Sequence, residues 1–204
     1  MTTCRPITIE ECEQILTLIR AGFKYQDEND RRRYFQPNPQ IALALALEAS
    51  LGIRIGDVLE LEARNFKGNK LITQGKKTGK VQYRDINTEV SEYVKDYALE
   101  NGIKPGEKLF NVKVRNVQKQ LERITKYLQL DFVSTHSFRK LFANEAYKDS
   151  GYNLEVVKRL LKHTSIATTE RYIETMQEQV NATSAKMCFL PEEEIKSEKL
   201  VFEE

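Results

Sequence analysis

The segment IALALALEASLGI, residues 41–53, constrains the fold more than any other, because almost every position in it is apolar. It is too short to span a bilayer, and Glu48 interrupts it. The alternation of leucine with alanine also fits a strand. Alanine, leucine and glutamate favour a helix, however, and Pro39 suits a first helical turn. We therefore predict a buried helix that begins near Pro39.

The other periodic segments predict a mainly α-helical fold with one small antiparallel β-sheet. Thr8 and Glu11 have the spacing of a capping box, and the apolar residues that follow recur on one helical face. Residues 69–86 are typical of two strands joined by a basic turn, and they form the only convincing hairpin. The polar segment 24–40 contains prolines at its end, so we expect a loop or linker there. Further helices are expected over residues 54–61, 87–102, 114–128, 135–151 and 153–163.

The composition is typical of one soluble globular domain, with 204 residues of which 40% are hydrophobic and 30% charged. We expect residues 1–180 to form this domain and residues 181–204 to form a C-terminal tail. No basic segment followed by an apolar one opens the chain, so no secretory signal is predicted. Three scattered cysteines without metal-ligand spacing favour a reducing, cytoplasmic location.

The formal charge of +2 conceals an asymmetry between the tail and the rest of the chain. Residues 189–204 contain six acidic residues and two lysines, which leaves +6 on residues 1–188. Between Arg64 and Arg84 there are seven lysines or arginines and no acidic residue. Such a local excess suits a polyanionic partner, although a solvated surface is the simpler alternative.

The chain offers side chains for every step of a metal-independent phosphodiester cleavage. That reaction needs a nucleophile, positive donors on the two non-bridging oxygens and an acid that protonates the leaving 5′-oxygen. Arginine contacts phosphate bidentately and keeps its charge, while histidine can donate or move a proton near neutral pH. A lysine on a mobile hairpin can reach the leaving oxygen. A tyrosine among such cations is a plausible nucleophile.

Four motifs carry these side chains in a fixed order: LGIRIGDVLEL at 51–61, QGKKTGK at 74–80, HSFRK at 136–140 and LLKHTSIATTERY at 160–172. Together they resemble the catalytic domain of the tyrosine recombinases, the phage integrase family. The resemblance runs from about Thr8 to Tyr172 and includes a nine-residue spacing from His163 to Tyr172. It implies the mainly helical fold of a tyrosine recombinase catalytic domain.

The resemblance also implies which residues bind the scissile phosphate. Arg54 and Arg139 match the two clamp arginines, and Asp57 matches the acidic residue that supports the first. His136 matches the partner of Arg139, near a helix start where backbone N–H groups favour an anion. His163 matches the second histidine, which contributes another donor. Each residue alone would more often be structural, but both histidines of the chain fall at motif positions.

The remaining implied roles belong to the nucleophile and the general acid. Tyr172 matches the tyrosine that becomes linked to a DNA 3′-phosphate. Lys77 matches the hairpin lysine that protonates the leaving oxygen, and a one-residue slip would give this role to Lys76. Residues expected to contact the DNA are Lys76, Lys80, Arg115 and Lys119.

Some positions depart from the family pattern. Phe138 and Lys140 stand where leucine and histidine are more common, and Lys162 stands where a glycine commonly precedes the second histidine. These changes remove no catalytic group. The helical core-binding domain that most members carry before the catalytic domain is not found in this chain.

We therefore expect a site-specific DNA recombinase that exchanges strands through a 3′-phosphotyrosyl intermediate. It should use no metal or nucleotide cofactor, bind double-stranded DNA, assemble as a tetramer on that DNA and not associate with membranes. The tail after residue 180 would dock on a neighbouring protomer. The alternatives are DNA relaxation of the type IB topoisomerase kind, a DNA-binding module without catalysis, and a metal hydrolase that uses the two histidines. The last is disfavoured by their separation of 27 residues and by the absence of a ligand cluster.

Overall fold

The computed structural model describes residues 4–26, 30–74, 81–163, 165–170, 172–173 and 184–185. The chain divides into two units, Met1–Ile173 and Glu174–Glu204. The elements described below all belong to the first unit. The predicted C-terminal tail lies almost entirely outside the described residues.

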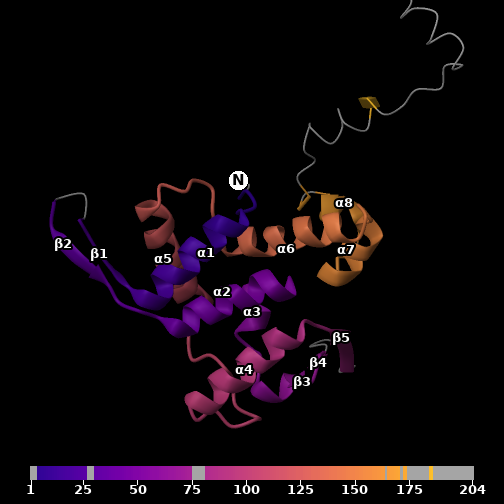
Figure 1. Cartoon of the computed structure of the whole chain (residues 1–204), viewed down its shortest axis with the longest axis horizontal. Coiled ribbons are helices and arrows are strands. Elements are labelled where there is room, and N and C mark those ends of the chain that lie inside the picture. The colour runs from indigo at the N-terminus through magenta and orange to yellow at the C-terminus, as the bar shows by residue number, and fades with distance from the viewer. Residues whose placement is uncertain are drawn as a thin grey trace, which may run out of the picture. The chain divides into compact units, whose positions relative to one another are not determined.

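The buried helix predicted from the apolar segment is α2, Pro39–Leu51, which runs through the middle of the first unit (Figure 1). The side chain of Asn38 caps its start by accepting a hydrogen bond from the backbone N–H of Ile41. Most of its side chains are buried, and it packs against α1, Ile9–Ala21, and α6, Thr135–Asp149. The prediction of a buried helix is confirmed, and the other helices lie around it.

The remaining predicted helices are also confirmed, within a residue or two at most ends. Asn87 and Asn153 cap their helices with side-chain oxygens, as expected for asparagine at a helix start. The structure adds one short helix close to the nucleophile motif. The further helices are α3, Ile55–Val58; α4, Thr88–Glu100; α5, Val114–Tyr127; α7, Leu154–Leu161; and α8, Ile166–Glu170. No helix within the described ranges is long and apolar enough to cross a membrane.

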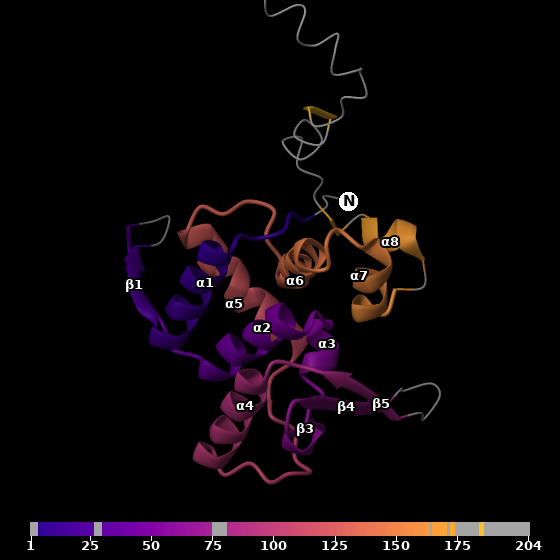
Figure 2. The same cartoon turned by 45° about the vertical axis from the view of Figure 1, so that its right-hand side comes forward.

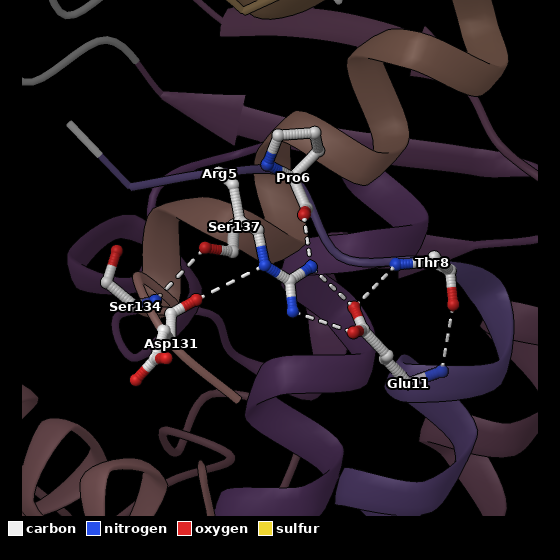
Figure 3. A network of polar contacts seen from close by, with 7 residues as sticks. All are labelled: Arg5, Pro6, Thr8, Glu11, Asp131, Ser134 and Ser137. Atoms are coloured by element: carbon white, nitrogen blue, oxygen red, sulfur yellow. Dashed lines mark hydrogen bonds and ion pairs between the residues drawn. The ribbon is translucent and has the colours of Figure 1, made fainter. Parts of the chain in front are cut away.

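The N-terminal segment ties the start of α1 to the loop before α6 (Figure 3). Thr8 and Glu11 form the predicted capping box. The guanidinium of Arg5 contacts both carboxylate oxygens of Glu11 at 2.7 Å and donates to the backbone oxygen of Asp131 at 3.2 Å. The backbone N–H of Arg5 donates to the carbonyl of Phe132. This network holds the N-terminal side of α6, the helix that carries the HSFRK motif.

The predicted hairpin is present and belongs to a three-stranded antiparallel sheet of order β3-β4-β5. Thr73 pairs with Gln82 in its register, next to the last described pair before the turn. The turn itself, residues 75–80, lies outside the described residues. A short additional strand, which the sequence did not predict, extends the sheet on one side. The strands are β3, Phe66–Lys67; β4, Lys70–Gln74; and β5, Val81–Asp85.

The expectation of a loop over residues 24–40 was wrong for most of its length. Two antiparallel strands, β1, Phe23–Gln26, and β2, Arg32–Phe35, form a second hairpin there. Phe23 stacks on Phe35 with ring centroids 5.2 Å apart and contacts Tyr127 of α5 at 4.3 Å. These aromatic contacts favour strand pairing, although the charged residues at the hairpin's tip conceal the alternation. The described residues therefore form two small sheets, which extend from different sides of the helices (Figures 1 and 2).

Gly52 ends α2 in the left-handed region, with φ of 59° and ψ of 23°. A β-carbon added there would overlap the ring of Phe142 on α6. Glycine is therefore needed at this position for two reasons: it adopts the positive φ, and it has no β-carbon that would block the close approach of α6.

Gly52→Ala should lower the free energy of unfolding by about 2 kcal/mol more than Gly68→Ala. Gly68 is the matched control, because it has the same φ of 59° and a β-carbon added to it would meet no heavy atom within 4 Å. Urea denaturation of both variants measures the difference. Equal losses would show that the packing of Phe142 on Gly52 contributes nothing.

Glu48 is the buried carboxyl group of α2, with 0% of its surface exposed. Its Oε1 accepts a hydrogen bond from the backbone N–H of Ile55 at 3.0 Å. Its Oε2 has no hydrogen-bond partner among the described residues. Burial raises the pKa of Glu48 to about 8, against the opposing effects of the Ile55 N–H and of Arg139.

Glu48→Gln should stabilise the protein increasingly as the pH rises. Between about 4.5 and about 8, folded Glu48 keeps a proton that the unfolded chain has lost, so the free energy of unfolding falls with rising pH. Glutamine keeps an acceptor for Ile55 and does not titrate. Urea denaturation near pH 5 and near pH 9 should show a larger advantage of the variant at the higher pH. A constant difference between the two proteins would contradict the raised pKa.

Candidate active site

A pocket of about 870 Å³ lies between α3, the β4–β5 hairpin, and parts of α6 and α7. Among the described site residues, Arg54 and Arg139 line it, whereas His136, His163 and Tyr172 do not. In Figure 2, α3 lies between α6 and α7 on one side and the hairpin on the other. Both clamp arginines line the pocket, although 85 residues separate them in sequence. Among the other residues that line it are Asp57, Thr73, Gln82, Leu161 and Lys162.

Arg139 is the most buried of the predicted site residues, with only 2% of its surface exposed. One terminal nitrogen, Nη1, donates to the carbonyl of Gly52 at 2.6 Å, and Nη2 donates to the carbonyl of Leu161 at 2.8 Å. Its Nε has no partner among the described residues. Burial lowers the pKa of Arg139, and the nearby charge of Arg54 adds to that effect. Arg139 therefore joins the ends of α2 and α7 from the middle of α6.

His163 contacts Arg139 and is itself almost buried, with 7% of its surface exposed. Its Nε2 lies 3.1 Å from Nη2 of Arg139, and its Nδ1 lies 3.1 Å from the hydroxyl of Thr169. Arginine can only donate, so Nε2 accepts and the proton is on Nδ1, which donates to Thr169. Burial, followed by the charges of Arg139 and Arg54, lowers the pKa of His163 to about 4. The imidazole is therefore neutral near pH 7.

Tyr172 lies beside this pair and is partly buried. Its ring centroid is 4.9 Å from that of His163 in an edge-on arrangement, and 5.8 Å from Cζ of Arg139. The ring also packs on the small apolar cluster that contains Val157 and Leu161. Tyr172 is thus a packing residue and, at the same time, a phenol held against the buried arginine.

Arg54 and His136 are both exposed. Arg54 is the residue before the first turn of α3 and lines the pocket together with Asp57. His136 lies in the first turn of α6. Burial and the charges of Arg139, Arg54 and Lys140 lower the pKa of His136. The predicted support of Arg54 by Asp57 stays a prediction.

The predicted hairpin lysines and DNA contacts have different outcomes. Lys76, Lys77 and Lys80 fall outside the described residues, although β4 and β5 on either side of them border the pocket. Arg115 and Lys119 are exposed on α5 and do not line the pocket. Any contact that they make with DNA is therefore away from the reacting phosphate.

Two cations near the site were missed as functional candidates. Arg84 of β5 donates to the carbonyls of Leu51 and Leu160, the residues that precede the two acceptors of Arg139. Lys140 has only 8% of its surface exposed, donates to the carbonyl of Cys4 at 2.6 Å and lies 5.8 Å from the ring centroid of Tyr172. The position of Lys140 next to Arg139 in the sequence could have indicated that Lys140 belongs to the site. No local feature of the sequence distinguished Arg84 from a solvated strand residue.

No group of three histidine, cysteine, aspartate or glutamate side chains is arranged to hold a metal ion within the part of the chain that the structure describes. Charged side chains of both signs line the pocket: four are basic and three acidic, namely Arg54, Arg64, Arg139 and Lys162, and Asp57, Glu60 and Glu62. Arginine donors suit an anionic group such as a phosphate rather than a cation.

Comparison with known proteins agrees with this geometry. Residues 7–179 match the model of the phage integrase family. A probable integrase/recombinase of Acholeplasma phage L2 is 26% identical over 134 residues, which cover 60% of this chain and 45% of that protein. The chain thus spans about half the length of the curated relatives that it matches.

Two solved structures show the same fold. The catalytic domain of bacteriophage HP1 integrase superposes with a TM-score of 0.59 at 19% identity, over 83% of this chain and 86% of that one. The site-specific recombinase XerH, in a pre-cleavage complex with its difH substrate, gives a TM-score of 0.63 at 20% identity, over 88% of this chain and 53% of that one. With its motifs, its pocket and a family match that covers most of its length, this chain belongs to the phage integrase family of tyrosine recombinases.

Proposed function

We propose that this chain is the catalytic part of a site-specific recombinase that cuts and rejoins double-stranded DNA through a 3′-phosphotyrosyl bond. The observation that carries the proposal is the contact of Tyr172 and His163 with the buried Arg139. A phenol held against a guanidinium beside a neutral imidazole brings three groups to one place. The phenol is the nucleophile, the guanidinium donates hydrogen bonds to an anion, and the imidazole accepts a proton. The DNA-bound XerH complex supports the choice of substrate.

The placement of the predicted phosphate-binding residues supports the roles that we propose for them. The exposed Arg54 and His136 contact the incoming phosphate first, and Arg139, which is buried and lines the pocket, binds it next. The Nε of Arg139 and the second hydrogen of its Nη1 are the donors that the backbone carbonyls leave available. As Arg139 turns toward the phosphate, Nε2 of His163 is released from it.

The chemical step transfers the phosphate from DNA to the tyrosine. The phenol oxygen of Tyr172 attacks phosphorus, its proton passes to neutral His163, and the bond from phosphorus to the 5′-oxygen breaks. The imidazolium that forms then donates to a non-bridging oxygen. Lys77, or its neighbour Lys76, protonates the leaving 5′-oxygen. The phosphotyrosyl bond keeps the energy of the broken linkage, so a 5′-hydroxyl of a partner strand reseals it without a nucleotide or a metal.

Strand exchange between two duplexes requires four active sites, so we propose a tetramer on DNA. Residues 1–180 would form the catalytic domain of each protomer. Residues 181–204 would dock on the neighbouring protomer, where their acidic side chains meet basic surface. Deletion of residues 181–204 with no effect on assembly would remove this part of the proposal.

Tyr172→Phe should abolish covalent capture of DNA and leave DNA binding intact. The test uses a pool of nicked random-sequence duplexes, from which the cleaved fragment diffuses away so that resealing cannot occur. On a denaturing gel, the wild type should give a band shifted by the mass of the protein, and the variant should give none. Phenylalanine keeps the ring that packs on Leu161, so the fold is preserved.

Two results would contradict the proposed chemistry. A covalent band that persists in Tyr172→Phe would assign the nucleophile to another residue. DNA binding without any covalent band from the wild type would support a DNA-binding module without catalysis. Relaxation of supercoiled DNA with no recombinant product would instead favour the topoisomerase alternative.

Arg115→Ala and Lys119→Ala should weaken DNA binding at low salt and reduce its salt dependence. The two residues are four positions apart on α5 and share one exposed face. Each lost phosphate contact should reduce the slope of log K against log salt by about 0.9. Binding titrations at several salt concentrations measure it, with Lys95→Ala on the exposed side of α4 as the control. An unchanged slope would remove these residues from the interface.

A further inference from the structure

Lys162, the residue before His163, adopts a backbone conformation that normally requires glycine. It ends α7 in the left-handed region, with φ of 55° and ψ of 40°. A lysine in this region is strained, because its β-carbon approaches the backbone too closely. Strain of this kind persists where the surrounding structure fixes the conformation. The contacts of the Lys162 side chain indicate what fixes it here.

The ammonium group of Lys162 lies on the hairpin that carries the predicted general acid. Its Nζ donates to Oε1 of Gln82 at 2.5 Å and lies 3.5 Å from the hydroxyl of Thr73. Thr73 and Gln82 are partners in the register of β4 and β5. One ammonium therefore holds both strands at the second pair before the turn at residues 75–80.

The same side chain borders the pocket of the phosphate-binding arginines. Lys162 lines it together with Arg54, Asp57 and Arg139. Burial and the charge of Arg84 lower the pKa of Lys162, and Asp57 opposes this effect. Lys162 is exposed, so solvent screens these charges, and its contacts with Gln82 and Thr73 are what fix the position of its ammonium group. Both of these hydrogen bonds join the ammonium of Lys162 to the hairpin.

We propose that Lys162 is a positioning residue that fastens the β4–β5 hairpin to α7 and so sets where the hairpin lysine meets the leaving 5′-oxygen. Its backbone continues directly into His163, which contacts Arg139. Lys162 thereby connects the β4–β5 hairpin to His163 and Arg139. This inference rests on the proposed function, in which Lys77 or Lys76 is the general acid.

Two variants separate the ammonium from the backbone conformation. Lys162→Gly removes the side chain and suits the left-handed conformation, so its thermal stability should not fall below that of the wild type. Lys162→Met keeps the aliphatic chain and loses the charge. Both proteins are compared with the wild type in single-turnover cleavage of a nicked duplex recovered from the random-sequence pool by covalent capture.

Cleavage is measured on two versions of this duplex. One has the natural 5′-oxygen at the scissile linkage, and the other has sulfur in that position. A thiolate leaves without a proton from a general acid, so it does not need a correctly placed lysine. On the oxygen substrate, both Lys162 variants should be slower than the wild type by about tenfold. On the sulfur substrate, they should come within about twofold of it.

A double variant tests whether Lys162 acts through the hairpin lysine. Adding Lys162→Gly to Lys77→Ala should slow cleavage of the oxygen substrate no further than Lys77→Ala alone, because both changes affect one step. If Lys76 is the general acid, the same relation should hold with Lys76→Ala. Additive losses with both lysine variants would overturn the inference.

The remaining outcomes distinguish this inference from the proposed function. Wild-type rates for both Lys162 variants on the oxygen substrate would overturn the inference and leave the function intact. Slow cleavage that sulfur does not rescue would also overturn it, because Lys162 would then act elsewhere. Absence of a covalent band from the wild-type protein would refute the proposed function, and the inference would fall with it.

Discussion

A single buried guanidinium holds together the parts of the molecule that form the site. Arg139 reaches from α6 to the carbonyl of Gly52 at the end of α2 and to that of Leu161 at the end of α7. These carbonyls belong to helix ends, which lack partners within their own helices. An arginine is the side chain that can serve two such acceptors and still present further donors to a ligand. The same guanidinium therefore connects α2, α6 and α7 and also lines the pocket.

The surroundings of Arg139 disfavour additional positive charge. Positive neighbours and burial lower the pKa of both histidines and of Arg139 itself. Glu48 is the nearby buried acid, and burial keeps it protonated near neutral pH, so it does not neutralise the cluster. Asp57, Glu60 and Glu62 also line the pocket, but Arg54 still lowers the pKa of Arg139, and an anion that binds both cations would relieve their repulsion. The fold thus maintains an environment that a DNA phosphate would stabilise.

Much of the fold could be predicted because its patterns are local. The apolar run of α2, the caps at Thr8 and Asn153 and the stripe of α5 all depend on residues within a few turns of each other. The β1–β2 hairpin was missed because charged residues at its tip conceal the alternation and because one of its aromatic contacts, that of Phe23 with Tyr127, is about a hundred residues away in sequence. The role that we propose for Lys162 was also missed because it depends on distant residues: its partners lie on β4 and β5.

The sequence by itself determined the β4–β5 hairpin, the identity of the motif residues and every helix described here except α8, because periodicity, capping and motif spacing are local properties of the chain. Only the tertiary structure decided that Arg139 is buried, that His163 is a neutral acceptor with its proton on Nδ1, and that Tyr172 faces both. These properties depend on burial and on hydrogen bonds between distant segments. No local pattern specifies them, because each arises when helix ends from different parts of the chain meet around one charged group.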